Sequence, residues 1–412
     1  MKDGKYIVAL DVGTTKICAV VGRITSDSVE TVSVNTRPSA GLRKGVVVDM
    51  DAAAASIREC VKSAEETSGI AIGEAFVSIS GSHIRGFKSS GAVGITEGVV
   101  KQKDIDKVME TAQTVYVPLD KEVLHIVPVE YIVDGEGEIL NPIGMRGVRL
   151  EANVQIVTGS INSIQNLLKC CRMAGVEVVE VMLSPLVTAM AALREDEKKY
   201  GAVLADIGGG TMDIALFRND TFLGTSIVDV GGNQFTNDVA VGLRLPVVEA
   251  ERVKKAYGSA FITDDQAKEE VSIMVANREE RKIPRSYITE IIKPRCEEVI
   301  GLLKEEIERI SGYDQAPYGV VLTGGMAQLN GFVKMAESTL GMPVRLGSPE
   351  GRNVIDKVKS PVYSTAVGLL LYAHKNLVEA HFFDKLSTDL SSVKKWVFGL
   401  GGKMFKFKSR NK

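Results

Sequence analysis

A glycine-rich turn that follows an acidic residue is the first part of the sequence that could do chemistry. An apolar run leads into Asp206, and Gly208, Gly209, Gly210 and Thr211 follow before a second apolar run. This order predicts a strand, a tight turn and a strand. Glycine lets the backbone approach a ligand closely, and successive turn N–H groups can form a concave phosphate site. Asp206 could hold Mg²⁺ through water, although an ordinary glycine-rich hairpin is the alternative.

A second turn of the same design lies near the start of the chain. Asp11 follows an apolar run, and Gly13, Thr14, Thr15 and Lys16 precede the next one. The two acidic residues are about one domain's length apart, so each is expected to belong to its own domain. Asp11 and Asp206 are the two metal-ligand candidates of the sequence.

A third turn, Gly324, Gly325 and Met326, follows the apolar residues 320–322 and is expected to open into a helix. Two Asp-Gly-Thr hairpins followed by a strand, two glycines and a helix resemble the phosphate and adenosine motifs of the actin-like ATPase superfamily. The resemblance implies an α/β, actin-like (ribonuclease H-like) fold of two domains with an ATP cleft between them.

The bulk composition is that of an ordinary globular protein and excludes several classes. The chain has 412 residues, which suits two main domains with additions. Its formal net charge of −2 gives no whole-protein attraction to nucleic acid. The five cysteines have no metal-ligand spacing, so reduced thiols in a cytosol are expected. Neither a signal peptide nor an apolar run of the roughly 20 residues that span a bilayer is expected.

The elements around the motifs predict where the domains begin and end. Residues 84–160 break the pattern and are interpreted as a small inserted α+β subdomain, a candidate partner site or a plain insertion. Residues 273–283 are polar and predict an exposed loop, and 285–310 predict a long helix kinked at Pro294. The expected parts are the first domain (1–83 and 161–195), the insertion (84–160), the second domain (196–362, outer part about 232–310), a connecting helix (363–380), a flexible linker (381–392) and a terminal helix (393–412).

Residues 5–373 resemble the FtsA family of bacterial cell-division proteins. The stretches 79–86, 141–151 and 363–370 carry this resemblance, and the insertion sets it apart from other actin-like proteins. Small-residue helices at 184–193 and 362–370 resemble the two connecting helices of the superfamily. The resemblance implies a nucleotide site that adds three groups of residues to the hairpins: Gly231, Gly232 and Asn233; Glu251, Lys254 and Lys255; and Gly324, Gly325 and Met326. Lys254 and Lys255 could equally be a solvated helix face.

One position departs from the hydrolytic relatives. Where their first connecting helix begins with an acid that orients water, this chain has Ser184. A hydroxyl is a poor base, and general-base help is worth about two to four orders of magnitude. We therefore expect ATP binding with at most weak hydrolysis, and no catalytic residue is assigned.

The last twenty residues combine an apolar stripe with lysines. From residue 393 onward there is no acid, and the apolar face at helical spacing contains Val393, Trp396, Val397, Leu400, Met404 and Phe407. This pattern is typical of a helix that lies on an anionic membrane. A basic unstructured end or a nucleic-acid arm is the alternative, and the single tryptophan on the apolar face favours the membrane.

The family resemblance implies a cytoskeletal adaptor rather than a metabolic enzyme. Such a protein binds ATP with Mg²⁺, polymerises, and tethers the C-terminal peptide of the tubulin-like FtsZ, for which the helix containing Arg295 is the candidate site. It works at the cytoplasmic face of the membrane at the division site, and later division proteins would bind the inserted subdomain. The alternative is a PilM-like pilus-assembly protein; a sugar kinase or a chaperone of the same fold would need parts that this sequence does not show.

Overall fold

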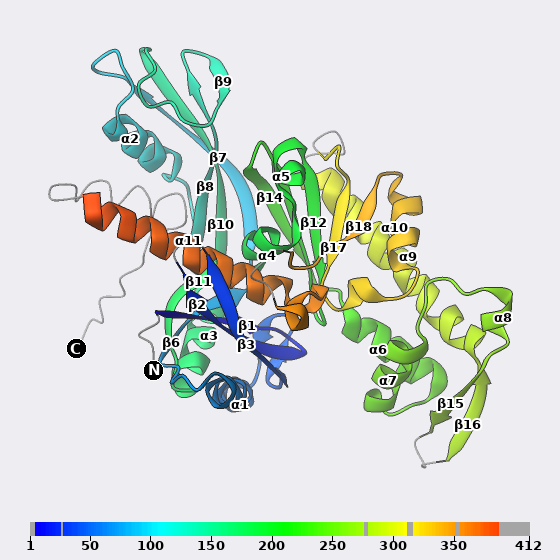
Figure 1. The fold of residues 1–412 in the computed structure, drawn as a ribbon. Helices are drawn as coiled ribbons and strands as arrows, with labels where there is room; N and C mark the ends of the chain where they lie inside the picture. The colour runs from blue at the N-terminus through cyan, green and yellow to red at the C-terminus, as the bar shows by residue number, and fades with distance from the viewer. Residues whose placement is uncertain (1–4, 26–27, 276–278, 311–315, 351–354, 387–412) are drawn as a thin grey trace.

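Two five-stranded sheets form the body of the molecule in the computed structural model, which describes residues 5–25, 28–275, 279–310, 316–350 and 355–386. The inserted subdomain and the outer part of the second domain project at opposite ends (Figure 1). The observed architecture is therefore the predicted α/β fold of two domains with an insertion.

The first sheet has the strand order β11-β6-β1-β2-β3. Its strands are β1 (Tyr6–Val12), β2 (Lys16–Ile24), β3 (Val29–Pro38), β6 (Glu74–Ile79) and β11 (Glu177–Leu183). The first three form an antiparallel meander, whereas β1, β6 and β11 run parallel. Since β1 lies in the middle and both faces of the sheet are covered, its residues are nearly all buried and apolar.

Helices cover both faces of this sheet. On one face lie α1 (Met50–Ser68) and α3 (Ile161–Met173), and on the other lie α4 (Ser184–Ala192) and α11 (Ser364–Leu386). Asp49 caps the N-terminus of α1, because its carboxylate accepts a hydrogen bond from the N–H of Ala52 at 3.0 Å. A two-stranded ribbon, β4 (Leu42–Arg43) and β5 (Val46–Val47), precedes α1.

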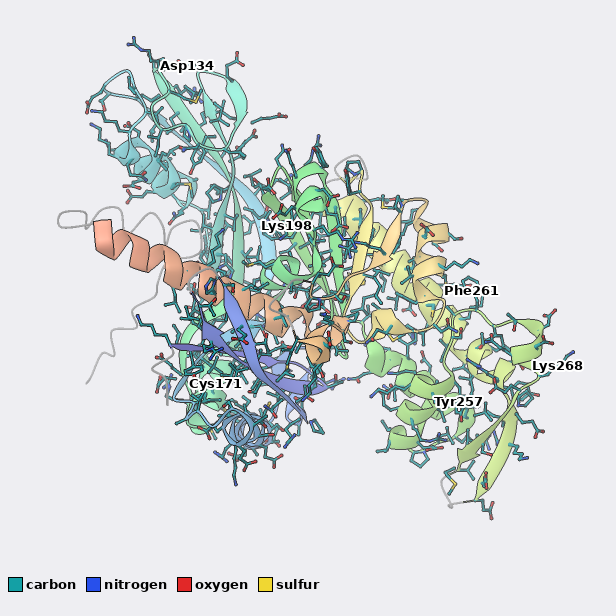
Figure 2. All side chains as sticks on the ribbon, viewed as in Figure 1. Asp134, Cys171, Lys198, Tyr257, Phe261 and Lys268 are labelled. Atoms are coloured by element: carbon teal, nitrogen blue, oxygen red, sulfur yellow. The ribbon has the colours of Figure 1, made fainter. Side chains whose placement is uncertain are left out.

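The inserted subdomain has its own four-stranded sheet, in the order β7-β10-β8-β9, and one helix packed on it. Its elements are β7 (Arg85–Gly94), α2 (Gln102–Ala112), β8 (Lys121–Val133), β9 (Glu136–Ile139) and β10 (Arg149–Ser160). The tip, which Figure 2 marks at Asp134, points away from the body. The base packs against β14 of the second domain, so the insertion contacts both halves of the protein.

The second sheet repeats the pattern of the first in the order β14-β13-β12-β17-β18. Its strands are β12 (Ala202–Ile207), β13 (Met212–Arg218), β14 (Thr221–Val228), β17 (Val320–Thr323) and β18 (Val344–Leu346). The helical elements of this half are α5 (Glu195–Tyr200), α6 (Gly232–Leu243), α7 (Val247–Tyr257), α8 (Asp264–Ala267), α9 (Arg285–Ile310), α10 (Phe332–Leu340) and the 3₁₀ turns η2 (Met326–Gln328), η3 (Asp356–Val358) and η4 (Pro361–Tyr363). In the space between the sheets, α4 packs against strands of both.

Several local predictions were wrong. Residues 273–283 are not an exposed loop, since β15 (Glu270–Met274) and β16 (Glu280–Pro284) form an antiparallel hairpin. Its buried residues, Val271, Ile273 and Ile283, are too few to stand out among the polar ones. Strand β7 was not predicted, because its serines, glycines and basic residues hide a strand pattern.

Two helix predictions also need correction. The turn at Gly324 and Gly325 opens into a single 3₁₀ turn, and α10 begins only at Phe332. Helix α11 continues to Leu386, so the first residues of the predicted linker 381–392 are helical. The predicted terminal helix 393–412 lies outside the described residues.

Candidate nucleotide site

A cavity of about 690 Å³ lies between the two halves of the protein. Every residue predicted to contact a nucleotide lines it except Gly231, which lies directly behind the second hairpin. The structure thus brings together residues as far apart in the chain as Asp11 and Met326. Ser184, at the start of α4, also lines the cavity.

The two Asp-Gly-Thr hairpins face each other across the cavity and nearly touch. In the first, the N–H of Gly13 donates to the carbonyl of Lys16 at 3.0 Å, and in the second Gly208 donates to Thr211 at 2.9 Å. A Cβ atom added at Gly209 would lie 2.2 Å from Thr15, and one at Gly210 would lie 2.7 Å from Thr14. Only glycine allows this approach, which leaves the backbone of the turns exposed to a ligand.

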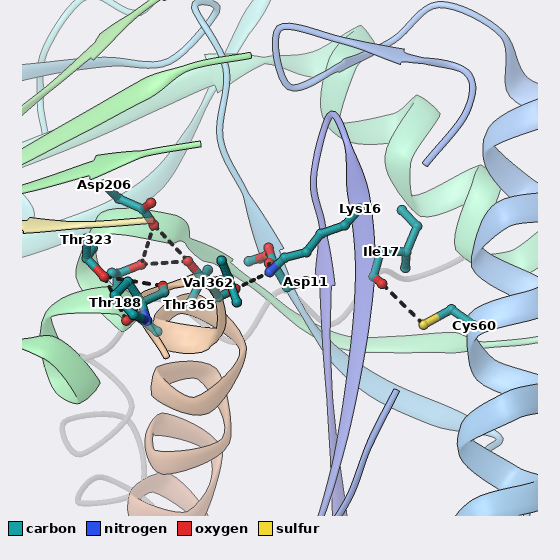
Figure 3. A network of polar contacts seen from close by, with 12 residues as sticks. Asp11, Lys16, Ile17, Cys60, Thr188, Asp206, Thr323, Val362 and Thr365 are labelled. Carbon is teal, nitrogen blue, oxygen red and sulfur yellow. Dashed lines mark hydrogen bonds and ion pairs between the residues drawn. The ribbon is translucent and has the colours of Figure 1, made fainter. Parts of the chain in front are cut away.

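Asp206 is held by hydroxyl groups from both connecting helices. Its Oδ2 atom accepts a hydrogen bond from Thr365 of α11 at 2.9 Å and a longer one from Thr188 of α4 at 3.4 Å (Figure 3). Burial raises the pKa of Asp206 to about 6, and the Thr365 hydrogen bond opposes this shift. Both donors are neutral, so they leave the carboxylate its charge, and no described residue hydrogen-bonds to its Oδ1 atom.

Asp11 lies across from Asp206 and has a different set of partners. Its Oδ1 accepts a hydrogen bond from Ser78 at 2.8 Å, and its Oδ2 lies 3.8 Å from the Lys16 ammonium. The same ammonium donates to the carbonyl of Val362 (Figure 3). It also lies 5.4 Å from the ring centre of Tyr363. Lys16 therefore joins the first hairpin to the start of α11.

The site fits magnesium that arrives with a phosphate rather than a resident metal. Among the described residues no three His, Cys, Asp or Glu side chains form a cluster that could hold a metal ion. Asp11, Asp206 and the threonine hydroxyls nevertheless supply the hard oxygen donors that Mg²⁺ prefers. Mg²⁺ commonly uses one or two carboxylates and completes its shell with water and phosphate.

Asp213 and Ser80 line the cavity but were missed by sequence reasoning. Asp213 stands opposite Asp206 in the register of β12 and β13, and it accepts a hydrogen bond from Ser80 at 2.6 Å. Burial raises the pKa of Asp213 to about 7, and the neighbouring Asp206 charge adds to the shift. The acid at the end of the second hairpin was visible in the sequence, and Ser80 lies in the family-like stretch 79–86, but neither residue was assigned a role in the site.

The two predicted lysines of α7 have different roles. Lys254 is only 8% exposed, and its ammonium donates to Gly232 at 3.1 Å and Thr236 at 2.9 Å while pairing with Glu251 at 2.6 Å. It therefore fastens α7 to α6. Lys255 also pairs with Glu251, at 3.1 Å, but its side chain is 72% exposed. Lys255 is thus the one of the two that is free to turn toward a ligand.

Arg295, the predicted peptide-binding residue, is already engaged in ion pairs. Its Nε and Nη2 atoms donate to the two carboxylate oxygens of Asp238 in α6 at 2.7 and 3.0 Å, and its Nη1 donates to Glu298. The arginine is about one quarter exposed and ties α9 to α6. A peptide carboxylate would have to compete with Asp238 for it. The six predicted membrane-contacting residues, Val393, Trp396, Val397, Leu400, Met404 and Phe407, lie outside the described residues.

Solved structures with similar folds are actin-like proteins. The PilM–PilN type IV pilus biogenesis complex matches with a TM-score of 0.64 and 18% identity, over 89% of this chain and 98% of that one. MreB5 of Spiroplasma citri bound to ADP matches with a TM-score of 0.56 and 16% identity, over 90% and 98%. At such low identity these likenesses show the fold alone. No helix in the described part of the chain has the length and apolar character to span a bilayer.

Sequence comparison gives the family. The family model "Cell division protein FtsA" matches residues 203–368, and "SHS2 domain inserted in FTSA" matches residues 81–158. FtsA of Pseudomonas aeruginosa is 42% identical over 376 residues, which is 90% of each chain. FtsA of Bacillus subtilis is 37% identical over 380 residues, or 91% of this chain and 85% of that one. The resemblance predicted from the motifs is confirmed, and the chain belongs to the FtsA family of actin-like proteins.

Proposed function

We propose that this chain is a cell-division protein that binds ATP with Mg²⁺ in the cleft between its two actin-like domains. The observation that carries the proposal is the cleft itself, where two Asp-Gly-Thr hairpins from separate domains face a cavity large enough for a nucleotide. The names of the relatives support a role in division, and the ADP-bound MreB5 supports a nucleotide in a cleft of this fold.

The residues divide the work of binding by their chemistry. The N–H groups of the two turns, other than those of Gly13 and Gly208 that already donate within them, would hold phosphate oxygens, and the Lys16 ammonium would neutralise part of their charge. Asp11 and Asp206 would hold Mg²⁺ through water, and the ion would offset the charge on the phosphates. Ser184 offers no carboxylate base, so hydrolysis is expected to be weak.

The wider role is that of an adaptor between a filament and a membrane. The nucleotide-bound body would polymerise in an actin-like manner, with the basic C-terminal segment holding it on anionic lipid at the cytoplasmic face of the division site. The C-terminal peptide of FtsZ would bind near Arg295, and later division proteins would bind the inserted subdomain. Membership of the FtsA family supports this role over that of a PilM-like protein, with which the chain shares its fold.

The decisive experiment is to replace Asp206 with alanine. Calorimetry of Mg²⁺-ATP and of ATP with a chelator gives the gain in affinity that the metal supplies, and Asp206→Ala should abolish this gain. Asp265→Ala is the matched control, because it removes the same charge from an exposed position in α8 that does not line the cavity. Unchanged Mg²⁺-ATP affinity in a folded Asp206→Ala protein would show that the metal is held elsewhere.

A further inference from the structure

Arg285, the first residue of α9, lines the cavity. It lies at the end of the cavity where α7 ends, because its Nε atom donates to the carbonyl of Tyr257, the last residue of α7. Tyr257, which Figure 2 marks on this part of the second domain, is its neighbour in space. Ala256, Gly258, Leu329 and Asn330 line the same end of the cavity.

Two of the three nitrogen atoms of this guanidinium group are fixed by the protein. The Nε atom donates to the carbonyl of Tyr257 at 3.3 Å, and Nη1 donates to the carboxylate of Glu269 at 2.8 Å. The side chain is only 13% exposed. The Nη2 atom, by contrast, has no hydrogen-bond partner among the residues that the structure describes. A nearly buried arginine with unused donors at a cavity wall is arranged for a ligand.

The ligand group that suits this arginine is an aromatic ring rather than a phosphate. Glu269 already compensates its charge, so the pair attracts anions only weakly. The planar face of a guanidinium group still stacks on aromatic rings, and its free N–H groups can donate to a ring nitrogen or a sugar hydroxyl. Leu329 adds an apolar surface at the same end. These features describe a pocket for a nucleobase.

We propose that Arg285 recognises the nucleobase of the bound nucleotide and is a specificity-determining residue of this cleft. The inference rests on the proposed function, since it concerns the same cavity. It separates two parts of the site: the hairpins hold the phosphates, and Arg285 holds the base. Loss of Arg285 should therefore weaken the binding of only those ligands that carry a base.

The test compares ATP with ribose 5-triphosphate, which has the sugar and phosphates but no base. In Arg285→Gln we expect the dissociation constant for ATP to rise about five- to thirtyfold, the range for a desolvated cation–aromatic contact. The constant for ribose 5-triphosphate should stay as in the wild type. Arg281→Gln is the matched control, because it removes the same charge from an exposed position on the adjacent β16 and should alter neither constant.

A second variant separates shape from charge. Arg285→Lys keeps the positive charge but loses the planar guanidinium group, so it should weaken ATP binding as Arg285→Gln does. Full ATP affinity in Arg285→Lys, or equal losses for both ligands in Arg285→Gln, would overturn the inference while leaving ATP binding intact. Failure of the wild type to bind ATP at all would instead overturn the proposed function, and this inference with it.

Discussion

Gly368 lies where the two connecting helices cross, and its replacement by alanine tests how closely they must pack. A Cβ atom at this position in α11 would lie 1.8 Å from the carbonyl oxygen of Val187 in α4 and 2.6 Å from its carbonyl carbon. Both atoms belong to a helix backbone, which cannot turn aside as a flexible side chain can. An alanine here therefore has to push the helices apart.

The expected cost follows from this distance. Ordinary contact requires the helices to separate by roughly 1 Å or more, which breaks packing along the whole crossing. Overpacking of this kind typically costs about 1–3 kcal/mol, and the higher helix propensity of alanine returns about 1 kcal/mol. Because the clash is with backbone, we take the upper part of the range and expect the free energy of unfolding to fall by about 1–2 kcal/mol. The thermal unfolding midpoint should fall accordingly.

A matched control comes from Gly301, which is also inside a helix. A Cβ atom at Gly301 in α9 meets nothing within 4 Å, so Gly301→Ala should gain only helix propensity and raise the midpoint. Gly368→Ala should also weaken Mg²⁺-ATP binding, because Thr365 and Thr188 reach Asp206 from the two helices that must separate. A midpoint that rises in Gly368→Ala as it does in Gly301→Ala would refute the packing argument.

Three further predictions concern other parts of the molecule. Burial raises the pKa of Glu180 from 4.5 to about 7, although the Tyr372 hydroxyl donates to it at 2.8 Å. The folded protein therefore keeps a proton that the unfolded chain loses, so stability should fall as pH rises from 4.5 to 7, and denaturant titrations should show this slope flattened in Glu180→Gln. Arg295→Glu should weaken the binding of an acidic FtsZ-type peptide, measured by fluorescence anisotropy. Unchanged affinity would remove this residue from the site. In liposome cosedimentation, Trp396→Glu or truncation after Ser392 should abolish binding to anionic vesicles, and high salt should weaken the binding of the wild type. Persistent binding by the truncated protein would disprove the anchor.

The sequence was sufficient for the cleft because its hairpins are local features. In each, an apolar strand, an acid, glycine and threonine stand within a few residues, so the turn and its ligand-facing backbone can be predicted without knowing the fold. The order of the three motifs in the chain then implied which domain supplies each side of the cavity. Asp11, Asp206 and Gly324 all line the observed cavity for this reason.

The residues that were missed depend on contacts between distant segments. Ser80 directly follows β6, and Thr188 and Thr365 belong to helices; only the packed fold places these hydroxyl groups against Asp213 or Asp206. Arg285 likewise begins a long helix whose sequence gives no sign of a cavity. Hydroxyl and basic residues are common on surfaces, so their presence alone predicts no role.

The Asp206 carboxylate and the crossing of the two connecting helices form one structural unit. Thr188 and Thr365 hydrogen-bond to each other at 2.9 Å as well as to Asp206, so the crossing of α4 and α11 is also the support of that carboxylate. Rigid helices that cross at Gly368 can change their separation only by stretching this triangle of hydrogen bonds. The close packing of the two helices therefore also fixes the position of the Asp206 carboxylate, which would face the ion. A change in the angle between the two domains must consequently alter the position of the Asp206 carboxylate.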